Sequence, residues 1–282
     1  MHEQLLDTAI AAAHAGGEEL MRYFRRSDLS IGVKAENDFV TEADHASEAA
    51  VASLIRSRHP DHHLLGEEGG AGAGGVVAGG SGDMQWIIDP LDGTTNFVQG
   101  LPVFAVSIGC RRGAQMVAGA VWDPVGRNLF AATRGGGAFW NGSPMRVSTR
   151  PSLDGAFLAT GYPFRAKAAL DVYLLAFREV FQSARALRRC GAAALDLAYT
   201  AAGVYDGFFE FRLSAWDIAA GVLLIEEAGG RVSDLDGGQG YFESGNLVAG
   251  GDPVWRELRR AIAHHADESR LHAVDPAGGA VA

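Results

Sequence analysis

The sequence predicts a mixed α and β protein of two packed lobes, and three features support this prediction. The length of 282 residues is sufficient for one large domain or two lobes. The first half holds β-rich runs separated by turn signals, which is typical of an antiparallel meander. The second half alternates strands and helices, which favours an α/β arrangement. We therefore expect an N-terminal lobe over 1–149, a C-terminal lobe over 150–268 and a disordered tail over 269–282.

The N-terminal lobe is expected to begin with two helices. Residues 3–26 are rich in alanine, and their apolar residues are spaced for one face of an amphipathic helix. Thr41 is a suitable N-cap for a second helix that ends near Arg58. The stretch from Gly69 to Gly82 is almost all Gly, Ala and Val, and we interpret it as a surface loop. The expected strands cover 63–65, 85–88, 103–111, 115–122 and 128–133.

The C-terminal lobe is expected to contain four strands that alternate with four helices. The predicted strands cover 156–160, 186–189, 207–211 and 246–250. The predicted helices cover 170–181, 192–202, 215–228 and 254–265.

Composition excludes several classes of protein. The chain is 48% hydrophobic and 21% charged, so neither a disordered chain nor a fibre is expected. The formal net charge of −10 argues against nucleic acid as a partner, because affinity for its backbone comes from clustered Lys and Arg. Cys110 and Cys190 are too few for a disulfide framework and are expected to be free thiols. No signal peptide or membrane-spanning run is recognisable, so we expect a cytoplasmic protein with no membrane partner.

The segment Asp89-Pro90-Leu91-Asp92 follows an apolar strand, at the place where α/β sheets carry their sites. Pro90 fixes its own φ and keeps Asp89 extended, so two carboxylates and the carbonyl of Leu91 can converge. Gly93-Thr94-Thr95 is expected to open a short helix whose free N–H groups suit a phosphate. On this pattern alone, a purely structural turn is the more frequent case.

Two further acidic residues change that interpretation. Glu67 follows a predicted strand, and Asp217 stands near the start of a predicted helix. A solvated loop charge and a helix cap are their structural alternatives. Together with Asp89 and Asp92 they offer only oxygen ligands, which select Mg²⁺ or Mn²⁺ over zinc.

The expected chemistry follows from the charge of a phosphate monoester, which repels an incoming nucleophile. Two metal ions would neutralise this charge, activate a water and hold the leaving alkoxide. Thr94, together with Glu67, would orient that water and help to deprotonate it. The sequence therefore predicts a metal-dependent phosphomonoesterase.

These segments resemble the signatures of the inositol monophosphatase family. The resemblance is carried by Gly66-Glu67-Glu68, by Asp89 to Phe97 and by Trp216 to Gly221, and it extends from Lys34 to Gly230. It implies an α+β fold, a layered αβαβα sandwich, that is usually a homodimer. It also implies two to three Mg²⁺ ions as cofactors and a small phosphorylated polyol as substrate.

The resemblance implies roles for the acidic residues. Glu67, Asp89 and the carbonyl of Leu91 match ligands of the first Mg²⁺. Asp89, Asp92 and Asp217 match ligands of the second, and Glu67 contacts a weaker third ion through waters. Asp92 and Asp217 are also expected to contact the substrate.

The resemblance also implies a substrate pocket. Thr94 matches a water-activating threonine, and its amide with that of Gly93 matches a phosphate site. Glu210 matches an acceptor for polyol hydroxyls, and Gly191-Ala192-Ala193 matches a backbone wall. Lys34 matches a residue of a mobile catalytic loop, with a plain surface lysine as the alternative.

Asp44 resembles a carboxylate that lies behind the metals, and its alternative is a helix cap. The leading hypothesis for the reaction is hydrolysis of myo-inositol 1-phosphate to inositol and phosphate. Thr95 favours it, because nucleotide and histidinol-phosphate phosphatases of the family more often carry Lys at this position. Fructose-1,6-bisphosphatase or histidinol-phosphate phosphatase activity on the same centre is the alternative.

A hypothesis of another class is a regulatory partner of RNA or of a protein complex. Its support is the arginine content of 185–189 and 256–260. Apolar residues interrupt both runs, and ordinary solvated edges are the preferred interpretation.

Overall fold

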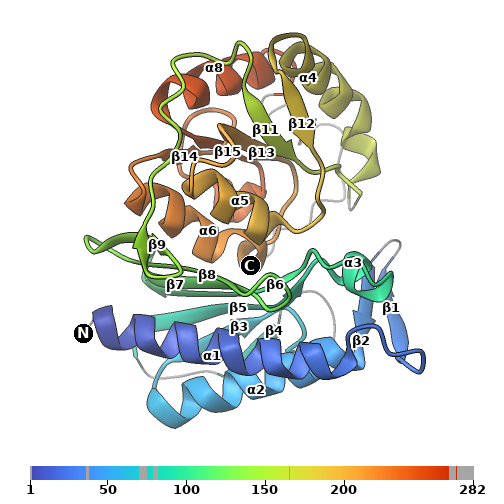
Figure 1. Ribbon diagram of the computed structural model, residues 1–282, viewed down its shortest axis with the longest axis vertical. Helices are drawn as coiled ribbons and strands as arrows, with labels where there is room; N and C mark the ends of the chain where they lie inside the picture. The colour runs from blue at the N-terminus through green and yellow to red at the C-terminus, as the bar shows by residue number, and fades with distance from the viewer. Residues whose placement is uncertain are drawn as a thin grey trace.

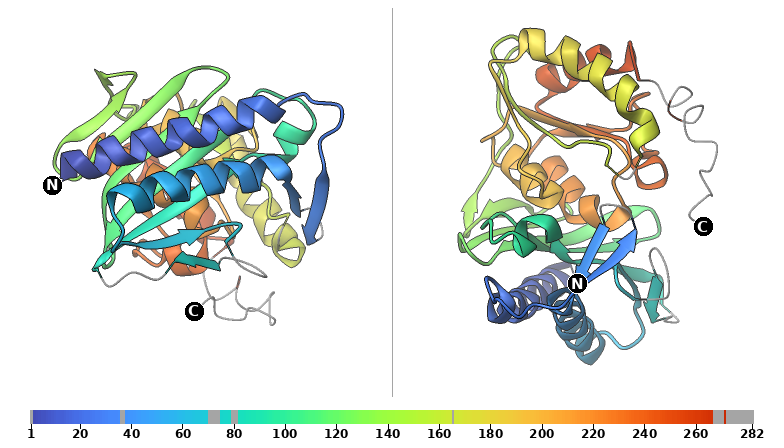
Figure 2. Two further views of the ribbon diagram at one scale, coloured as in Figure 1. Left: turned by 90° about the horizontal axis from the view of Figure 1, so that it is seen from below. Right: turned by 90° about the vertical axis from the view of Figure 1, so that its right-hand side faces the viewer.

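The computed structural model describes residues 2–35, 38–69, 75–78, 82–164, 166–266 and 271. The elements form five layers in the order helix, sheet, helix, sheet, helix (Figure 1). Figure 2 shows the same layers from below and from the side. The predicted α+β fold with αβαβα layers is confirmed.

The first sheet belongs to the N-terminal half of the chain. Its strands are β3 (His63–Gly66), β4 (Gly75–Ala78), β5 (Met84–Asp92), β6 (Ala105–Arg112), β7 (Gln115–Asp123), β8 (Asn128–Thr133), β9 (Gly137–Trp140) and β10 (Ser143–Pro144). Their order is β10-β9-β8-β7-β6-β5-β3-β4, and β3 and β5 are parallel. Helices α1 (His2–Tyr23) and α2 (Glu42–Arg58) cover one face (Figure 1).

The second sheet belongs to the C-terminal half. Its strands are β11 (Phe157–Thr160), β12 (Ala186–Arg188), β13 (Gly207–Glu210), β14 (Arg231–Ser233) and β15 (Leu247–Gly250). The order is β12-β11-β13-β15-β14, with β11 parallel to β12 and β13 and the other pairs antiparallel. Helices α4 (Leu170–Ser183) and α8 (Asp252–Ala263) lie on its outer face (Figure 1).

Helices α5 (Ala193–Ala201) and α6 (Ala215–Glu227) form the middle layer. Both are buried along most of their length, and one apolar core joins them to both sheets. Glycine in the sheet allows α6 to approach closely, because a Cβ at Gly109 would lie 2.8 Å from the Cβ of Ala219. This approach fixes the start of α6 against the first sheet. The lobe boundary near residue 150 remains our proposal, since α5 and α6 serve both sheets.

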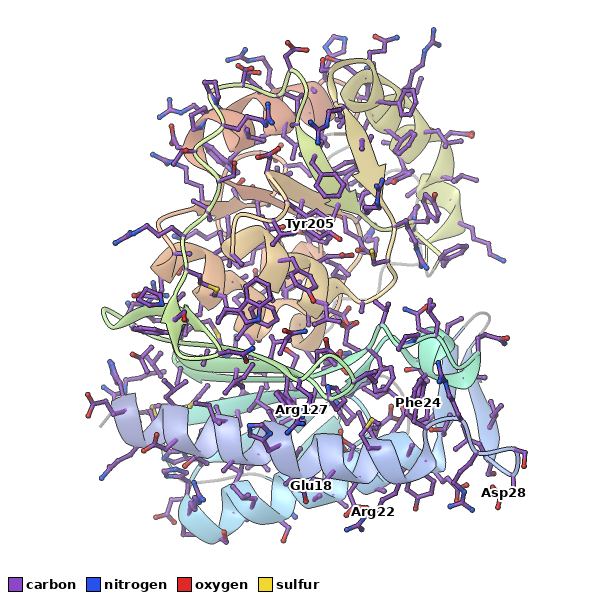
Figure 3. The ribbon with its side chains drawn as sticks, in the orientation of Figure 1. Glu18, Arg22, Phe24, Asp28, Arg127 and Tyr205 are labelled. Carbon is purple, nitrogen blue, oxygen red and sulfur yellow. The ribbon has the colours of Figure 1, made fainter. Side chains whose placement is uncertain are left out.

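Several smaller elements complete the fold, among them a 3-10 helix at Lys167–Ala169. Strands β1 (Ile31–Ala35) and β2 (Asp38–Thr41) pair as an antiparallel hairpin, and α3 (Thr94–Val98) and α7 (Tyr241–Ser244) are short helices. Figure 3 shows Phe24 beyond the end of α1, on the side of α3. Its ring lies 5.5 Å from that of Phe97 and 4.9 Å from that of Phe104. This aromatic group anchors α3 beside the end of β5.

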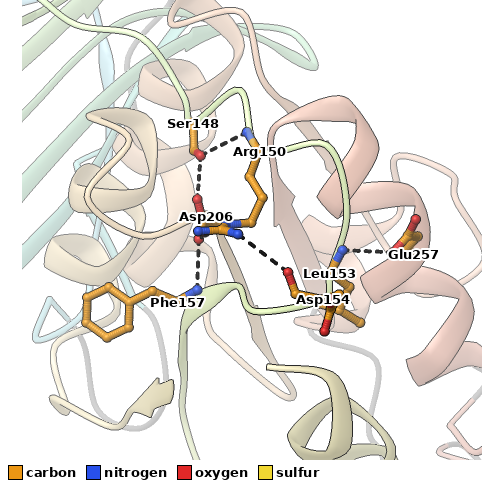
Figure 4. Close-up of polar contacts among 7 residues, drawn as sticks. All are labelled: Ser148, Arg150, Leu153, Asp154, Phe157, Asp206 and Glu257. Atoms are coloured by element: carbon orange, nitrogen blue, oxygen red, sulfur yellow. Dashed lines mark hydrogen bonds and ion pairs between the residues drawn. The ribbon is translucent and has the colours of Figure 1, made fainter. Parts of the chain in front are cut away.

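The segment that connects the two sheets is fixed by one buried carboxylate, shown in Figure 4. Asp206 accepts hydrogen bonds from Arg150 Nε and from the Phe157 N–H, both at 2.8 Å, and from the hydroxyl of Ser148. The Leu153 N–H donates to Glu257 of α8 at 2.8 Å. These contacts hold the connection against the second sheet.

The interpretation of Gly69 to Gly82 as a loop is wrong in part. Gly75–Ala78 forms β4, an antiparallel partner of β3. A strand ladder is made by backbone groups, so a glycine-rich edge segment with two valines can still pair. Residues 70–74 and 79–81 lie outside the described residues. So does the tail over 269–282, Leu271 excepted, and its disorder remains a prediction.

Both cysteines are free thiols, as predicted, with Cys110 buried and Cys190 partly buried. Among the described residues, no helix is long and apolar enough to cross a membrane.

Candidate active site

The end of β5 carries a bulge that turns two carboxylates to the same side. Asp89 pairs with Ser107 of β6, but Asp92 pairs with Ala105, so β5 holds one extra residue. In a regular strand, residues three apart point to opposite faces, and an inserted residue reverses that relation. Pro90 lies inside the bulge, where the missing N–H costs no ladder hydrogen bond. Asp89 and Asp92 therefore face one pocket.

Three carboxylates meet in that pocket. One oxygen each from Asp89, Asp92 and Asp217 lies within 4.8 Å of the other two. All three side chains are buried, with residue exposures of 1%, 8% and 6%. Burial and the charges of Glu67, Asp92 and Asp217 raise the pKa of Asp89 well above its usual value.

This donor set fits a divalent metal ion. Like charges brought together out of water repel each other, and a hard cation at their centre reverses that penalty. The donors are carboxylate oxygens, which suit Mg²⁺ or Mn²⁺. Leu91 also lines the pocket, and its backbone carbonyl would offer one more hard oxygen ligand.

Glu67 enters the pocket from the neighbouring strand. It directly follows β3, and its N–H donates to the carbonyl of Ile88 at 3.2 Å, which prolongs the pairing with β5. Its side chain lines the pocket and contributes to the raised pKa of Asp89. It is not among the three carboxylates that meet within 4.8 Å. Glu67 thus stands at the edge of the acidic group.

Asp92 and Asp217 also have structural contacts. Asp92 accepts hydrogen bonds from the N–H groups of Ala193, at 3.1 Å, and Ala194, at 2.7 Å. Asp217 accepts one from the N–H of Ser214 at 2.7 Å and forms the capping box of α6. The helix cap considered for Asp217 is therefore present, and it holds the carboxylate in the acidic group.

Thr94 and Asp44 are brought together by the fold. The hydroxyl of Thr94 lies 3.1 Å from the Leu91 carbonyl and 3.4 Å from Asp44 Oδ1. The other oxygen of Asp44 accepts from the N–H and hydroxyl of Thr41, at 2.8 and 2.6 Å, and caps α2. Asp44 is thus a helix cap that also reaches the site. The backbone of Lys34 lies in β1, but its side chain is outside the described residues, so its role remains a prediction.

The opposite wall of the pocket comes from the second half of the chain. Glu210 at the end of β13 lines it, and burial with the charges of Asp196 and Asp217 raises the pKa of Glu210 well above its usual value. A Cβ at Gly161 would lie 1.9 Å from the Glu210 carboxylate, so only glycine leaves it room. The predicted wall of Gly191 to Ala193 is also in place.

The sequence did not indicate several pocket residues. Arg189 is exposed, as expected for a solvated edge, yet it also lines the pocket. Its guanidinium lies 5.5 Å from the ring of Tyr162 and 5.1 Å from that of Phe164, which line the pocket as well. Asp196 of α5 does not line the pocket, but it is 2% exposed, and burial and the charge of Asp92 raise its pKa well above the usual value. No local motif marks these residues, because only the packing of the two halves brings them together.

Comparison with known proteins agrees with this geometry. Residues 1–271 match the sequence profile of the inositol monophosphatase family. The chain belongs to this family. It is 46% identical over 266 residues to the Nus factor SuhB of Pseudomonas aeruginosa. The alignment covers 93% of this chain and 97% of that protein.

Solved structures of the family superpose on the fold. The extragenic suppressor protein suhB of Bartonella henselae gives a TM-score of 0.87 at 38% identity, covering 92% of this chain and 98% of that one. The inositol monophosphatase of Anabaena gives a TM-score of 0.80 at 34% identity, and the superposition covers 95% of this chain and 98% of that one. Membership of this family of inositol monophosphatases supports phosphatase chemistry and metal binding.

Proposed function

We propose that this chain is a Mg²⁺-dependent phosphomonoesterase whose preferred substrate is myo-inositol 1-phosphate. One observation supports it above the others: three buried carboxylates converge with Glu67 on one pocket. Glu67, Asp89 and the Leu91 carbonyl would hold one ion, and Asp89, Asp92 and Asp217 a second. When bound, such ions neutralise a phosphate dianion and lower the pKa of a water beside it.

The side chains around Thr94 would orient the attacking water. The hydroxyl of Thr94 can donate to Asp44 or to the Leu91 carbonyl, which leaves its lone pairs for the water. Glu67 lies on the same pocket and would accept the proton of the water. The N–H groups of Gly93 and Thr94 would donate to the phosphate oxygens.

The far wall would hold the leaving alcohol. Glu210 would accept hydrogen bonds from sugar hydroxyls, and the backbone of Gly191 to Ala193 would define one side. A polyol offers several hydroxyl donors to these acceptors, whereas the cationic amine of histidinol phosphate would also be drawn to Glu210. We prefer the polyol phosphate to histidinol phosphate because Thr95, where histidinol-phosphate phosphatases of the family more often carry Lys, also lines the pocket.

Phosphate release from a panel of monoesters tests the proposal. We expect purified protein with Mg²⁺ to hydrolyse inositol 1-phosphate faster than fructose 1,6-bisphosphate or histidinol phosphate. Excess chelator should abolish the reaction, and added Mg²⁺ should restore it. A preference for histidinol phosphate would reject the substrate, and undiminished hydrolysis in chelator would reject the metal mechanism.

A second candidate function is that of a regulatory partner of RNA or of a protein complex. The observation that favours it is the name Nus factor, which relatives at 42–46% identity carry. Replacement of Asp89 by Asn separates the two functions, because it removes a charge that catalysis needs and leaves the surface intact. If a strain with only this variant lost phosphate release but grew normally, the regulatory role would be favoured.

We further propose that the protein is cytoplasmic and forms a homodimer. The exposed apolar side chains of α4 support self-association, since exposed apolar groups of this size often mark interfaces. They are Leu170, Leu174, Leu175 and Phe181, with exposures of 44–61%.

A further inference from the structure

The outer helix layer holds a second group of metal-binding side chains. Glu179 lies in α4, and His264 and His265 directly follow α8. One ligand atom of each lies within 4.8 Å of the other two. None of the three lines the candidate active site. The group is therefore independent of the phosphatase centre.

Two adjacent histidines converge just after the end of α8. Within a helix, neighbouring residues point in directions about 100° apart and do not share a ligand. Here α8 ends at Ala263, and the N–H of His265 turns back to the Ile262 carbonyl at 3.0 Å. The two imidazole rings lie 4.7 Å apart between centroids and are nearly perpendicular, at 81°.

Glu179 completes the group from the neighbouring helix. Its Oε2 lies 2.6 Å from His265 Nε2, and both side chains are only partly buried. Solvent can therefore reach the group and supply a further ligand. A positive ion here would also lie beside the C-terminal end of α8, where the helix dipole favours a cation.

We propose that Glu179, His264 and His265 bind a divalent transition metal ion, of which Zn²⁺ is the best match. Two imidazoles and one carboxylate, with a water in the fourth position, are a common Zn²⁺ ligand set. Tetrahedral bonds of about 2.0 Å place ligand atoms about 3.3 Å apart, so small side-chain rotations from the present separations suffice. The all-oxygen group of the active site has the opposite preference, for Mg²⁺. The active site would thus bind a hard ion such as Mg²⁺, and the outer site a borderline ion such as Zn²⁺.

A bound ion would link the end of α4 to the end of α8. These helices together cover the outer face of the second sheet (Figure 1). An ion that binds only the folded chain stabilises it by mass action. The site is therefore expected to be structural, with no part in phosphate release.

The test measures Zn²⁺ binding to full-length protein by equilibrium dialysis, in millimolar Mg²⁺ to occupy the active site. We expect the double variant His264→Gln/His265→Gln to bind one Zn²⁺ fewer per chain than the native protein. Glu179→Gln should weaken the same site. His45→Gln, which removes an exposed histidine of α2, is the matched control and should bind like the native protein.

Two further readouts make the result decisive. Co²⁺ should produce the intense visible bands of a tetrahedral site in native protein but not in the double variant. Zn²⁺ should raise the unfolding temperature of native protein more than that of the variant. Equal stoichiometry, affinity and spectra in native and variant proteins would overturn the proposal. Phosphate release with Mg²⁺ should be unchanged in the variants, so the outcome is separate from that of the proposed phosphatase function.

If the double variant fails to fold, Zn²⁺ binding to the single variant Glu179→Gln tests the proposed site. That change keeps the size of the side chain and removes only its charge. Undiminished Zn²⁺ affinity in Glu179→Gln would then reject the three-residue site.

Discussion

Asp92 Oδ2 accepts a hydrogen bond from the N–H of Ala194 at 2.7 Å. This contact joins the end of β5 to the first turn of α5, which lies 102 positions later in the chain. The same carboxylate belongs to the acidic group of the pocket. One residue therefore both fastens the middle helix layer to the first sheet and contributes a negative charge to the site.

Asp92→Ala should lower both stability and activity. The loss of its bonds to α5 should cost about 1 kcal/mol, as for other caps of helix N-termini. Phosphate release should fall by about 10²-fold or more, as when one group that stabilises the transition state is removed. Asp92→Asn is the matched control, since it keeps one acceptor and should lose activity with a smaller loss of stability. Because both variants remove the charge that repels Asp89, equal stability of Asp92→Ala and Asp92→Asn in urea unfolding with chelator would contradict the capping role.

Asp89→Asn should abolish phosphate release but stabilise the metal-free protein. Because the pKa of Asp89 is raised by burial and by three carboxylates, its charged form is disfavoured in the folded state. The resulting destabilisation is absent below the usual value of 3.8 and grows as pH rises toward the raised pKa. The amide is neutral and can still accept from the Leu91 N–H, which lies 3.0 Å from Oδ1.

Calorimetry in chelator checks this prediction. The unfolding temperature of Asp89→Asn should exceed that of the native protein at neutral pH, and the difference should shrink in acid. Added Mg²⁺ should then stabilise the native protein by about 2.7 kcal/mol at a hundredfold excess over Kd, and the variant by less. A variant less stable than native protein in chelator at every pH would show that repulsion among the carboxylates is unimportant.

Gly161→Ala should impair recognition of the alcohol more than cleavage of the phosphate. A Cβ at this position would lie 1.9 Å from Glu210, so the carboxylate must leave its present position. We expect KM for inositol 1-phosphate to rise by about tenfold, equivalent to about 1.4 kcal/mol. Hydrolysis of p-nitrophenyl phosphate, which offers no hydroxyl to Glu210, should change little. Equal losses for both substrates would assign Gly161 a general structural role.

Mild acid should weaken the packing beneath the first sheet. His62 Nδ1 accepts from Trp86 Nε1 at 3.0 Å, and its ring stacks on that of His59 at 4.6 Å. Burial lowers the pKa of both histidines below 6.5, with a smaller contribution to that of His59 from the charge of His62. Their contribution to stability is thus complete above pH 6.5 and is lost as pH falls through the lowered values.

His62→Asn separates this effect from general acid unfolding. Its amide oxygen can replace Nδ1 as the acceptor for Trp86 but does not titrate. The free energy of unfolding should therefore fall less between pH 7.5 and pH 5 in the variant than in the native protein. Parallel pH profiles for the two proteins would exclude His62 as the source.

Phe181→Glu should shift the protein from dimer to monomer. The side chain is 61% exposed on α4, and a charge there opposes burial against a second copy. Light scattering after size exclusion measures the mass directly. Glu243→Gln on α7, an exposed position away from α4, is the control. A native protein that is already monomeric would reject the homodimer.

Much of the fold could be predicted because its signals are local. The helix starting at Thr41 and the one holding Asp217 both begin with a capping box that is visible in sequence. Strands β4, β9, β10 and β14 and the hairpin of β1 and β2 were not predicted, so among the described residues the second sheet has five strands and not the expected four. Short strands depend on backbone pairing with partners that a local pattern does not reveal. The second sheet is mixed, because β14 and β15 pair antiparallel beside parallel strands. The direction of a strand pair also depends on partners that lie far apart in the chain.

The sequence by itself determined the acidic residues and their donor chemistry. Asp89, Asp92 and Asp217 follow from motifs whose residue types alone select an oxygen-bound cation. Tertiary structure alone decided that Asp92 binds α5, that Glu210 needs Gly161, and which histidines converge with Glu179. Such contacts join residues that are 49 to 102 positions apart, and their distances depend on how the layers pack. A linear pattern records residue type and spacing but not that packing.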